Sequence, residues 1–251
     1  MPDFSFSIAS IKITPFFWGL ALASLVSSFS FWRQLKEDFQ EEKVFSLTLL
    51  IFAFSLFFSR LFYLVSHLQI LNSSPVSWFF PQDFGFSLAG AFLGAVLAVN
   101  WRASKWEKNA WEVLDALVLP FFYFLILGGT GYFLTKGNWW SLAYVGLGLL
   151  GRLSYPWLKG SYRSFAWYKS GKTGFLISIY GFGLFFSFFS LAILKKGGLY
   201  LDNWLGLFLA SVFLIALYYR SERNLREDSQ VLFQKITNFR IEINRREKWP
   251  K

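Results

Sequence analysis

The chemistry available to this 251-residue chain is limited first by the side chains that it lacks. It contains no cysteine, which excludes a thiol nucleophile, a disulfide and a thiolate metal site. Its one histidine, His67, has no carboxylate cluster beside it, so we expect a surface residue, no metal site and no cofactor. The remaining site candidates are ionisable residues within or beside apolar stretches, where a charge is costly: Arg60, Asp83, Asp115 and Arg152.

Each of these four residues has a functional and a structural interpretation. Arg60 lies near the end of an apolar stretch, where it would contact a lipid phosphate or extend to the headgroup region. Arg152, four residues before Pro156, would either face a cavity or mark the cytoplasmic end of its stretch. Asp83 precedes one apolar stretch and Asp115 lies at the start of another, where an acidic side chain caps a helix N-terminus or is favoured by the helix dipole. Asp115 could instead pair with a buried arginine.

The elements that hold these residues are apolar stretches that recur along the whole chain. Hydrophobic residues make up 55% of the sequence and charged residues 16%, whereas soluble domains contain about 25% charged residues. A spanning helix needs roughly 20 mainly apolar residues. Seven such stretches lie near residues 16–32, 44–65, 84–101, 113–134, 139–158, 174–194 and 204–219. The sequence therefore predicts an all-α, polytopic membrane protein with about seven transmembrane helices.

Positive charge is concentrated on one side of these stretches. The segments after the first, third and fifth stretches and the C-terminal tail hold most of the lysines and arginines, and the opposite segments hold Lys12, Lys136, Lys195 and Lys196. The positive-inside rule then predicts an N-terminus outside and a C-terminus in the cytoplasm of a bacterium, with the chain in the inner membrane. We attribute the net charge of +10 to loops beside anionic lipid, and we expect no nucleic-acid partner.

The chain divides into a transmembrane domain, residues 1–219, and a basic cytoplasmic tail, residues 220–251. Apolar residues of the tail recur at three-, four- and seven-residue steps, which places them on one helical face: Leu225, Leu232, Ile236, Phe239 and Ile243. This pattern favours an amphipathic helix on the membrane surface. A partner-binding or coiled-coil helix and a disordered segment are the alternatives.

Several short motifs occur in the same order as in one known family. Residues 59–63 read Ser-Arg-Leu-Phe-Tyr, residues 83–94 read Asp-Phe-Gly-Phe-Ser-Leu-Ala-Gly-Ala-Phe-Leu-Gly, residues 128–133 read Gly-Gly-Thr-Gly-Tyr-Phe, and Asp115 and residues 170–181 complete the set. Over about residues 16–220 the chain resembles the bacterial prolipoprotein diacylglyceryl transferases. The resemblance implies seven spans with the N-terminus outside. It also implies transfer of diacylglyceryl from phosphatidylglycerol to the lipobox cysteine of a prelipoprotein.

The same resemblance implies that catalytic side chains of the family are missing. The motif histidine falls on Ala89, the arginine and asparagine of the fourth stretch on Gly129 and Tyr132, and the arginine and glutamate of the sixth on Leu184 and Phe188. Arginine stabilises a departing phosphate and a base activates an incoming thiol, and these five residues do neither. We therefore expect a catalytically degenerate member that binds phosphatidylglycerol-like lipid or prelipoprotein, or acts as a membrane scaffold. The 220–251 tail would contact a prelipoprotein or another membrane protein.

Two alternatives remain open. The chain could be an active transferase with relocated catalytic residues, which requires Arg60 or Arg152 to face a cavity that is open to the outer leaflet. It could also be a small transporter or a transporter subunit, which requires polar residues and broken helices at mid-membrane. Only the kink expected at Pro156 favours the transporter.

Overall fold

The computed structural model describes residues 6–8, 11–68, 85–106, 109–168, 170–195, 200–223 and 228. Its α-helices are α1 (Pro15–Leu35), α2 (Glu41–Ser66), α4 (Leu88–Lys105), α5 (Ala110–Tyr123), α6 (Gly129–Lys136), α7 (Trp140–Ser161), α8 (Phe175–Leu194) and α9 (Leu201–Arg220). A π-helical turn, η2 (Phe124–Gly128), joins α5 to α6, and a 3₁₀ turn, η3 (Tyr162–Ser164), follows α7. The strands β1 (Phe6–Ile8) and β2 (Ile11–Ile13) form a short antiparallel hairpin before α1.

Because α5, η2 and α6 run on as one segment, the described chain has seven long helical segments, one for each apolar stretch. Five of them are long and apolar enough to cross a membrane: α1, α2, the α5–α6 segment, α8 and α9. Helices α4 and α7 are not among these five; the last turns of α4 contain Arg102 and Lys105, and α7 contains Arg152 and Lys159. The all-α membrane fold is thus confirmed. The crossing of the membrane by α4 and α7, and the orientation of the termini, stay predictions.

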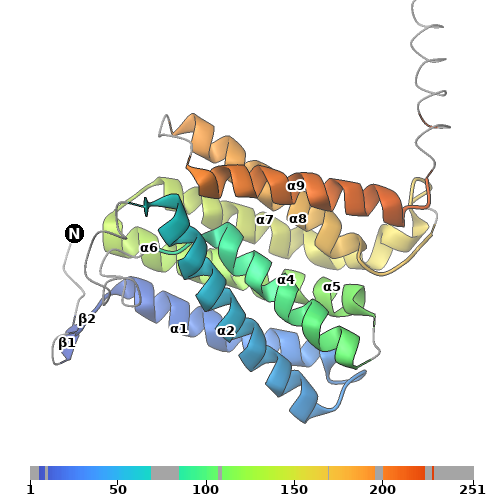
Figure 1. Ribbon diagram of the computed structural model, residues 1–251, viewed down its shortest axis with the longest axis horizontal. Helices are drawn as coiled ribbons and strands as arrows, with labels where there is room; N and C mark the ends of the chain where they lie inside the picture. The colour runs from blue at the N-terminus through green and yellow to red at the C-terminus, as the bar shows by residue number, and fades with distance from the viewer. Residues whose placement is uncertain are drawn as a thin grey trace, which may run out of the picture.

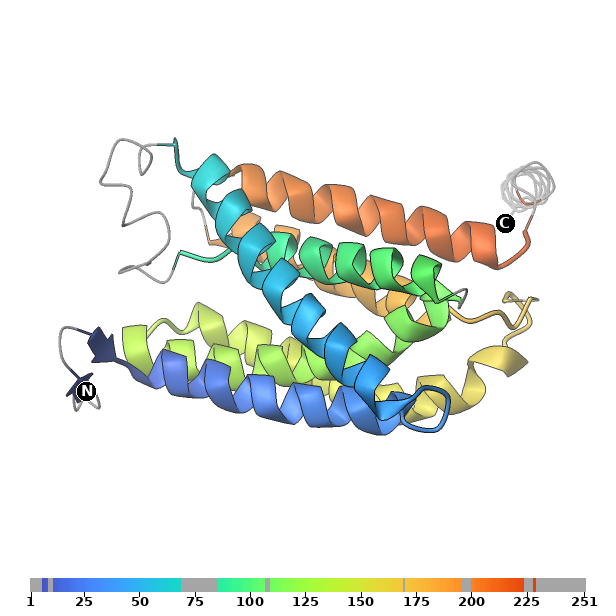
Figure 2. The same cartoon turned by 60° about the horizontal axis from the view of Figure 1, so that its bottom comes forward.

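The helices run back and forth along one common direction (Figures 1 and 2). The hairpin, the α6–α7 turn and the start of α4 lie at one end, which we call the hairpin end. The α1–α2 turn, the α7–α8 connection and the end of α9 lie at the other, which we call the basic end. The described parts of the predicted cytoplasmic segments therefore share one end of the molecule. Asp83 lies outside the described residues, as does all of the tail except residues 220–223 and 228.

Helix α2 crosses the bundle diagonally and packs mainly on α4 rather than on α1, its neighbour in sequence (Figure 2). Two glycines of α4 allow this approach: a Cβ atom at Gly90 would lie 2.6 Å from the carbonyl oxygen of Phe58, and one at Gly94 would overlap the carbonyl group of Phe54. Helix α1 is fixed in the same way on α6, where a Cβ atom at Gly19 would lie 3.1 Å from the Cα of Gly131. Small residues thus assign α1 and α2 to different partners.

The core between the helices is built around aromatic contacts. The ring of Phe92 in α4 makes edge-to-face contacts with Phe121 of α5, Phe185 of α8 and Phe213 of α9, at centroid distances of 5.0, 5.0 and 5.5 Å. Phe92, Phe185 and Phe213 are buried. This cluster joins four helices and accounts for part of the chain's large content of phenylalanine.

A proline in α5 is compensated by a side chain from α1. Pro120 has no N–H to donate to the carbonyl of Ala116, one turn earlier. The amide of Gln34 donates to that carbonyl instead, at 2.9 Å, and its oxygen accepts from the hydroxyl of Tyr155 at 2.6 Å. Gln34 therefore links α1, α5 and α7 in the half of the bundle nearer the basic end.

Asp115 caps a helix, but a different one from the helix that its position in the sequence indicates. It is the sixth residue of α5, and its carboxylate accepts from the backbone N–H groups of Gly174 at 2.6 Å and of Ile177 at 2.8 Å, at the start of α8. Gly174, the N-cap residue, has a φ of 97°, a left-handed conformation that favours glycine. Asp115 therefore connects α5 to the first turn of α8.

We predict that Asp115→Ala destabilises the protein by about 1–3 kcal/mol, because two N–H groups of α8 lose their acceptor. The matched control is Glu112→Ala, which removes an exposed acidic residue from the first turn of α5 and should change stability by less than about 0.5 kcal/mol. Thermal unfolding in detergent measures both. Equal midpoints for the two variants would show that the cap contributes nothing.

We also predict that Gly94→Val disrupts the contact of α2 with α4, because the added side chain meets the backbone at Phe54. Overpacking of this kind typically costs about 1–3 kcal/mol. Gly146→Ala is the control, since a Cβ atom there has no neighbour within 4 Å. The yield of monodisperse protein and the unfolding midpoint should both fall for Gly94→Val alone.

Candidate functional site

Arg60 lies near the hairpin end of α2 and is directed toward the chain that leads into α4. Its Nη1 donates to the carbonyl of Gly85 at 2.7 Å, and its guanidinium lies 5.4 Å from the ring centroid of Tyr63. The side chain is half-buried. Arg60 thus helps to fix the entry to α4 while its charge stays near the end of the bundle.

Next to Arg60, three helices meet through hydroxyl and carboxyl groups. Ser59 of α2 and Ser87, the N-cap residue of α4, exchange two hydrogen bonds: Ser59 Oγ donates to the carbonyl of Ser87 at 2.9 Å, and the N–H of Ser87 donates to the carbonyl of Ser59 at 3.1 Å. Ser87 Oγ accepts from the N–H of Gly90 and donates to the carboxylate of Asp202 in α9. Asp202 was not among the sequence candidates, although an acidic residue at the start of an apolar stretch is the same signal that singled out Asp115.

His67 follows α2 at this end and is held by stacking. Its ring lies 4.3 Å from the ring centroid of Tyr63 and 4.9 Å from that of Tyr200. It is half-buried rather than a surface residue as expected, because these two rings cover its faces. Within the described ranges, no three histidine or acidic residues lie close enough to hold a metal ion.

The five positions that the resemblance assigns to catalytic residues are occupied by packed glycine, alanine, leucine and aromatic residues. Ala89 and Leu184 are buried in the hydrophobic core. A Cβ atom at Gly129 would lie 2.9 Å from a methyl group of Val145. The rings of Tyr132 and Phe188 pack on Phe16 and Tyr144, at 5.8 and 6.1 Å. None of the five supplies a charge or a strong base.

Arg152 does not mark the end of a helix. Helix α7 continues through Pro156 to Ser161, so Arg152 lies well inside it. Its Nε donates to the hydroxyl of Tyr123 at 3.1 Å, and Tyr123 immediately precedes the π-helical turn η2. Such turns are frequent at functional sites. Arg152 is therefore a charged residue in the interior of a helix, and it donates a hydrogen bond to a neutral phenol.

An apolar cavity of about 150 Å³ lies between α1, α2, α4 and α5. Its lining is made of aromatic and aliphatic side chains together with hydroxyl groups: Ser27, Ser28, Phe31, Thr48, Ile51, Phe52, Ser55, Leu88, Ala91, Phe92, Ala95, Leu117, Pro120, Phe121 and Phe124. A neighbouring groove between α1 and α2 shares Ser28, Thr48 and Phe52 with it. The groove therefore adjoins the cavity on the side formed by α1 and α2.

Among the described residues, none with a charged side chain lines this cavity. The lining does not include Arg60, Asp115, Arg152 or Asp202. Two of its hydroxyl groups already donate hydrogen bonds within the protein. Ser27 Oγ donates to the carbonyl of Pro120 at 2.9 Å, and Thr48 Oγ1 donates to the carbonyl of Val44 at 2.8 Å. Arg60 and Arg152 therefore do not meet in this cavity. The cavity could hold hydrocarbon but offers no group for proton or phosphate chemistry.

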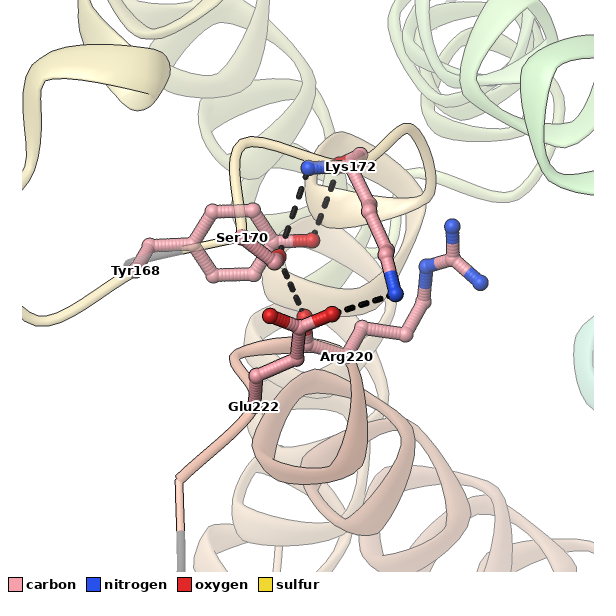
Figure 3. A network of polar contacts seen from close by, with 5 residues as sticks. All are labelled: Tyr168, Ser170, Lys172, Arg220 and Glu222. Atoms are coloured by element: carbon pink, nitrogen blue, oxygen red, sulfur yellow. Dashed lines mark hydrogen bonds and ion pairs between the residues drawn. The ribbon is translucent and has the colours of Figure 1, made fainter.

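At the basic end, a set of polar contacts fastens the α7–α8 connection to the end of α9 (Figure 3). Ser170 Oγ donates to the carbonyl of Arg220 at 2.5 Å, and the hydroxyl of Tyr168 donates to the carbonyl of Lys172 at 2.9 Å. Lys172 forms an ion pair with Glu222. Burial raises the pKa of Tyr168, so its hydroxyl remains a donor at neutral pH. This network sets the point at which the chain leaves α9 toward the basic tail.

A comparison with protein-family models matches residues 4–154 to the model of prolipoprotein diacylglyceryl transferase. The match runs from the hairpin into α7 and includes Arg60, Asp115 and Arg152, whereas Leu184 and Phe188 lie beyond it. A search of curated proteins finds no match. Because the matched part is more than half of the chain, and because the all-α membrane fold agrees with it, the chain belongs to the prolipoprotein diacylglyceryl transferase family.

Proposed function

We propose that this protein is a catalytically degenerate member of the family, which binds a phospholipid chain in the bacterial inner membrane without transferring diacylglyceryl. The observation that carries the proposal is the apolar cavity between α1, α2, α4 and α5, which adjoins the groove between α1 and α2. This groove exposes large apolar side chains, including Phe29, Phe45 and Leu49. A hydrocarbon chain from the bilayer meets apolar surface throughout this path.

We infer the absence of transfer from the negative charge that the reaction develops and that the protein must stabilise. Loss of the headgroup phosphate develops negative charge, which arginine or another fixed donor must stabilise. The positions that the resemblance assigns to that task hold Ala89, Gly129 and Leu184, all packed against neighbours. Loss of one such donor typically reduces the rate by 10²–10³-fold, about 3–4 kcal/mol. Loss of several leaves a lipid-binding scaffold.

The second candidate is an active transferase with relocated catalytic residues, and Arg152 is the observation in its favour. Its guanidinium lies within the bundle beside a π-helical turn and has only a phenol as partner among the contacts described above. Isolated charges within a membrane are commonly functional. Transfer by this protein would therefore depend on Arg152, or on Arg60 at the hairpin end.

The basic tail is the second part of the proposal. It leaves α9 at the basic end, where Lys172 and Glu222 fix the start of the segment. Its arginines and lysines favour contact with anionic lipid on the cytoplasmic side, or with an acidic surface of a prelipoprotein or another membrane protein. The tail would then hold the protein close to its partner while the cavity holds lipid.

We predict that Ala95→Phe, which places a ring inside the cavity, lowers the amount of phospholipid that stays bound through purification in detergent. Exclusion of even two methylene groups costs about 1.6 kcal/mol, or roughly a tenfold loss of affinity. Leu97→Phe, on the outer face of the same helix, is the matched control. Phosphate analysis should show less lipid per protein with Ala95→Phe than with wild type or Leu97→Phe. Equal lipid in all three proteins would place the bound lipid outside the cavity.

We further predict that the protein fails to rescue a bacterium depleted of its own diacylglyceryl transferase. Expression and membrane insertion are confirmed by immunoblot, and prelipoprotein modification is read from its shift in gel mobility. Growth together with a modified lipoprotein would contradict the proposal that this protein is catalytically degenerate. Loss of that rescue with Arg152→Ala or Arg60→Ala would then identify the active transferase.

A further inference from the structure

The guanidinium of Arg152 is only partly engaged within the protein. Its Nε donates to the hydroxyl of Tyr123 at 3.1 Å, whereas its two terminal nitrogens donate to none of the described residues. The side chain is half-buried, and these nitrogens are not among the enclosed polar atoms that lack a partner. A group that approaches α7 from outside can therefore reach them.

The position of Arg152 along α7 makes this charge costly. It lies twelve residues after Trp140 and nine before Ser161, about 18 and 14 Å from the two ends of the helix. With α7 crossing the membrane, as the sequence predicts, the guanidinium lies near the bilayer midplane, where charged side chains pair with one another or with other polar groups. The headgroups of lipids lie about 15 Å away from the midplane, so lipid does not supply this partner.

Two further cations continue from Arg152 toward the basic end. Lys159 follows it by seven residues and Arg163 by eleven, steps that recur on one side of a helix. Lys159 Nζ lies 5.9 Å from the ring centroid of Tyr155, and Arg163 Nε donates to the hydroxyl of Tyr162 at 3.2 Å. The ion pairs between described residues involve other side chains. We call these three residues the cationic stripe.

An apolar face of α7 adjoins the cationic stripe. Its residues recur at steps of three and four, which places them on one side of the helix: Gly146, Leu149, Leu153, Trp157 and Gly160. The three large side chains are exposed, and a Cβ atom at either glycine would have no neighbour within 4 Å. Arg152 follows Leu149 by three residues, so it lies at the edge of this face. A second helix could therefore pack along α7 and bring an acidic group to Arg152.

The described helices of this chain contain no acidic residue that could fill this role from a second copy. Asp115 and Asp202 accept hydrogen bonds from the start of α8 and from Ser87. The other acidic residues of these helices lie in first turns, far from mid-membrane: Glu41, Glu42 and Glu112. Charge complementarity therefore indicates a different membrane protein as the partner.

We propose that α7 binds a transmembrane helix of another membrane protein, which carries a carboxylate at the depth of Arg152 and a second acidic residue opposite Lys159. The first carboxylate accepts hydrogen bonds from the terminal nitrogens of Arg152. Apolar side chains of the partner cover Leu149 and Leu153, and the two glycines allow close approach. None of these residues lines the cavity, so the surface is separate from the proposed lipid site. Binding requires no covalent step.

The probe for this surface is a synthetic, dye-labelled helix of about 20 leucine and alanine residues. It carries one glutamate at its centre and another seven residues further on, and its binding to the purified full-length protein in neutral detergent is measured by fluorescence anisotropy. Wild type should bind it about tenfold more tightly than a version with glutamine at both positions. Arg152→Met should remove this preference. Arg152→Lys, which keeps the charge, should retain a preference for glutamate.

The matched control is Lys105→Met, which removes an exposed lysine of the basic end from the last turn of α4 and should leave the preference unchanged. Lys159→Met, at an exposed position, provides a second variant if Arg152→Met does not fold, and it should remove the gain from the second glutamate alone. Ala95→Phe, which blocks only the cavity, should keep the preference. Failure of this inference is thereby distinguished from failure of the proposed function.

Three outcomes would overturn the proposal. Equal binding of the glutamate and glutamine peptides by wild type would show that no acidic group is recognised. Equal losses for Arg152→Met and Lys105→Met would indicate general attraction by positive charge. A full preference retained in both Arg152→Met and Lys159→Met would place the bound helix on another part of the protein.

Discussion

The close backbone contact of α2 with α4 is the constraint on which the remaining arrangement depends. Gly90 and Gly94 let the two helices touch, and the paired hydrogen bonds of Ser59 and Ser87 fix their register at the hairpin end. Gly19 allows α1 to pack on α6 in the same manner. The helices α1 and α2, which are consecutive in sequence, therefore pack on different partners. The cavity is the space that this division leaves between them, and hydroxyl groups rather than charges occupy its polar positions.

Charged groups in the bundle serve mainly to join helix ends. Asp115 caps α8, Asp202 engages the cap of α4, and Arg60 fixes the chain before α4. These contacts satisfy orphaned backbone groups where water is scarce, which is the main requirement that a bilayer places on a helix end. These three contacts do not involve the five positions that the resemblance assigns to catalysis. The residues at those positions contribute to helix packing instead.

Much of this fold could be predicted from the sequence, because apolar length and the placement of charge are local signals. The seven stretches correspond to the seven long helical segments of the described chain. Partners across the bundle could not be predicted. Asp115 stands at the start of its own stretch in the sequence, yet it caps α8, fifty-nine residues further on. One interpretation of Arg152 placed it at the end of a span, because Pro156 follows it. Helix α7 instead continues through Pro156 to Ser161. The contact of Arg152 with Tyr123 depends on tertiary packing that no spacing reveals.

The central claim is that a lipid chain enters between α1 and α2, and the absence of native cysteine allows a direct test. Ser28 of α1 and Thr48 of α2 both line the cavity and its outer groove. In the double variant Ser28→Cys and Thr48→Cys, a short cleavable thiol crosslinker would close this opening. The measurement is binding of a fluorescent phospholipid before crosslinking, after it, and after cleavage by a reductant. Our account predicts binding that is lost on crosslinking and restored on cleavage. Binding that is unchanged throughout would contradict it.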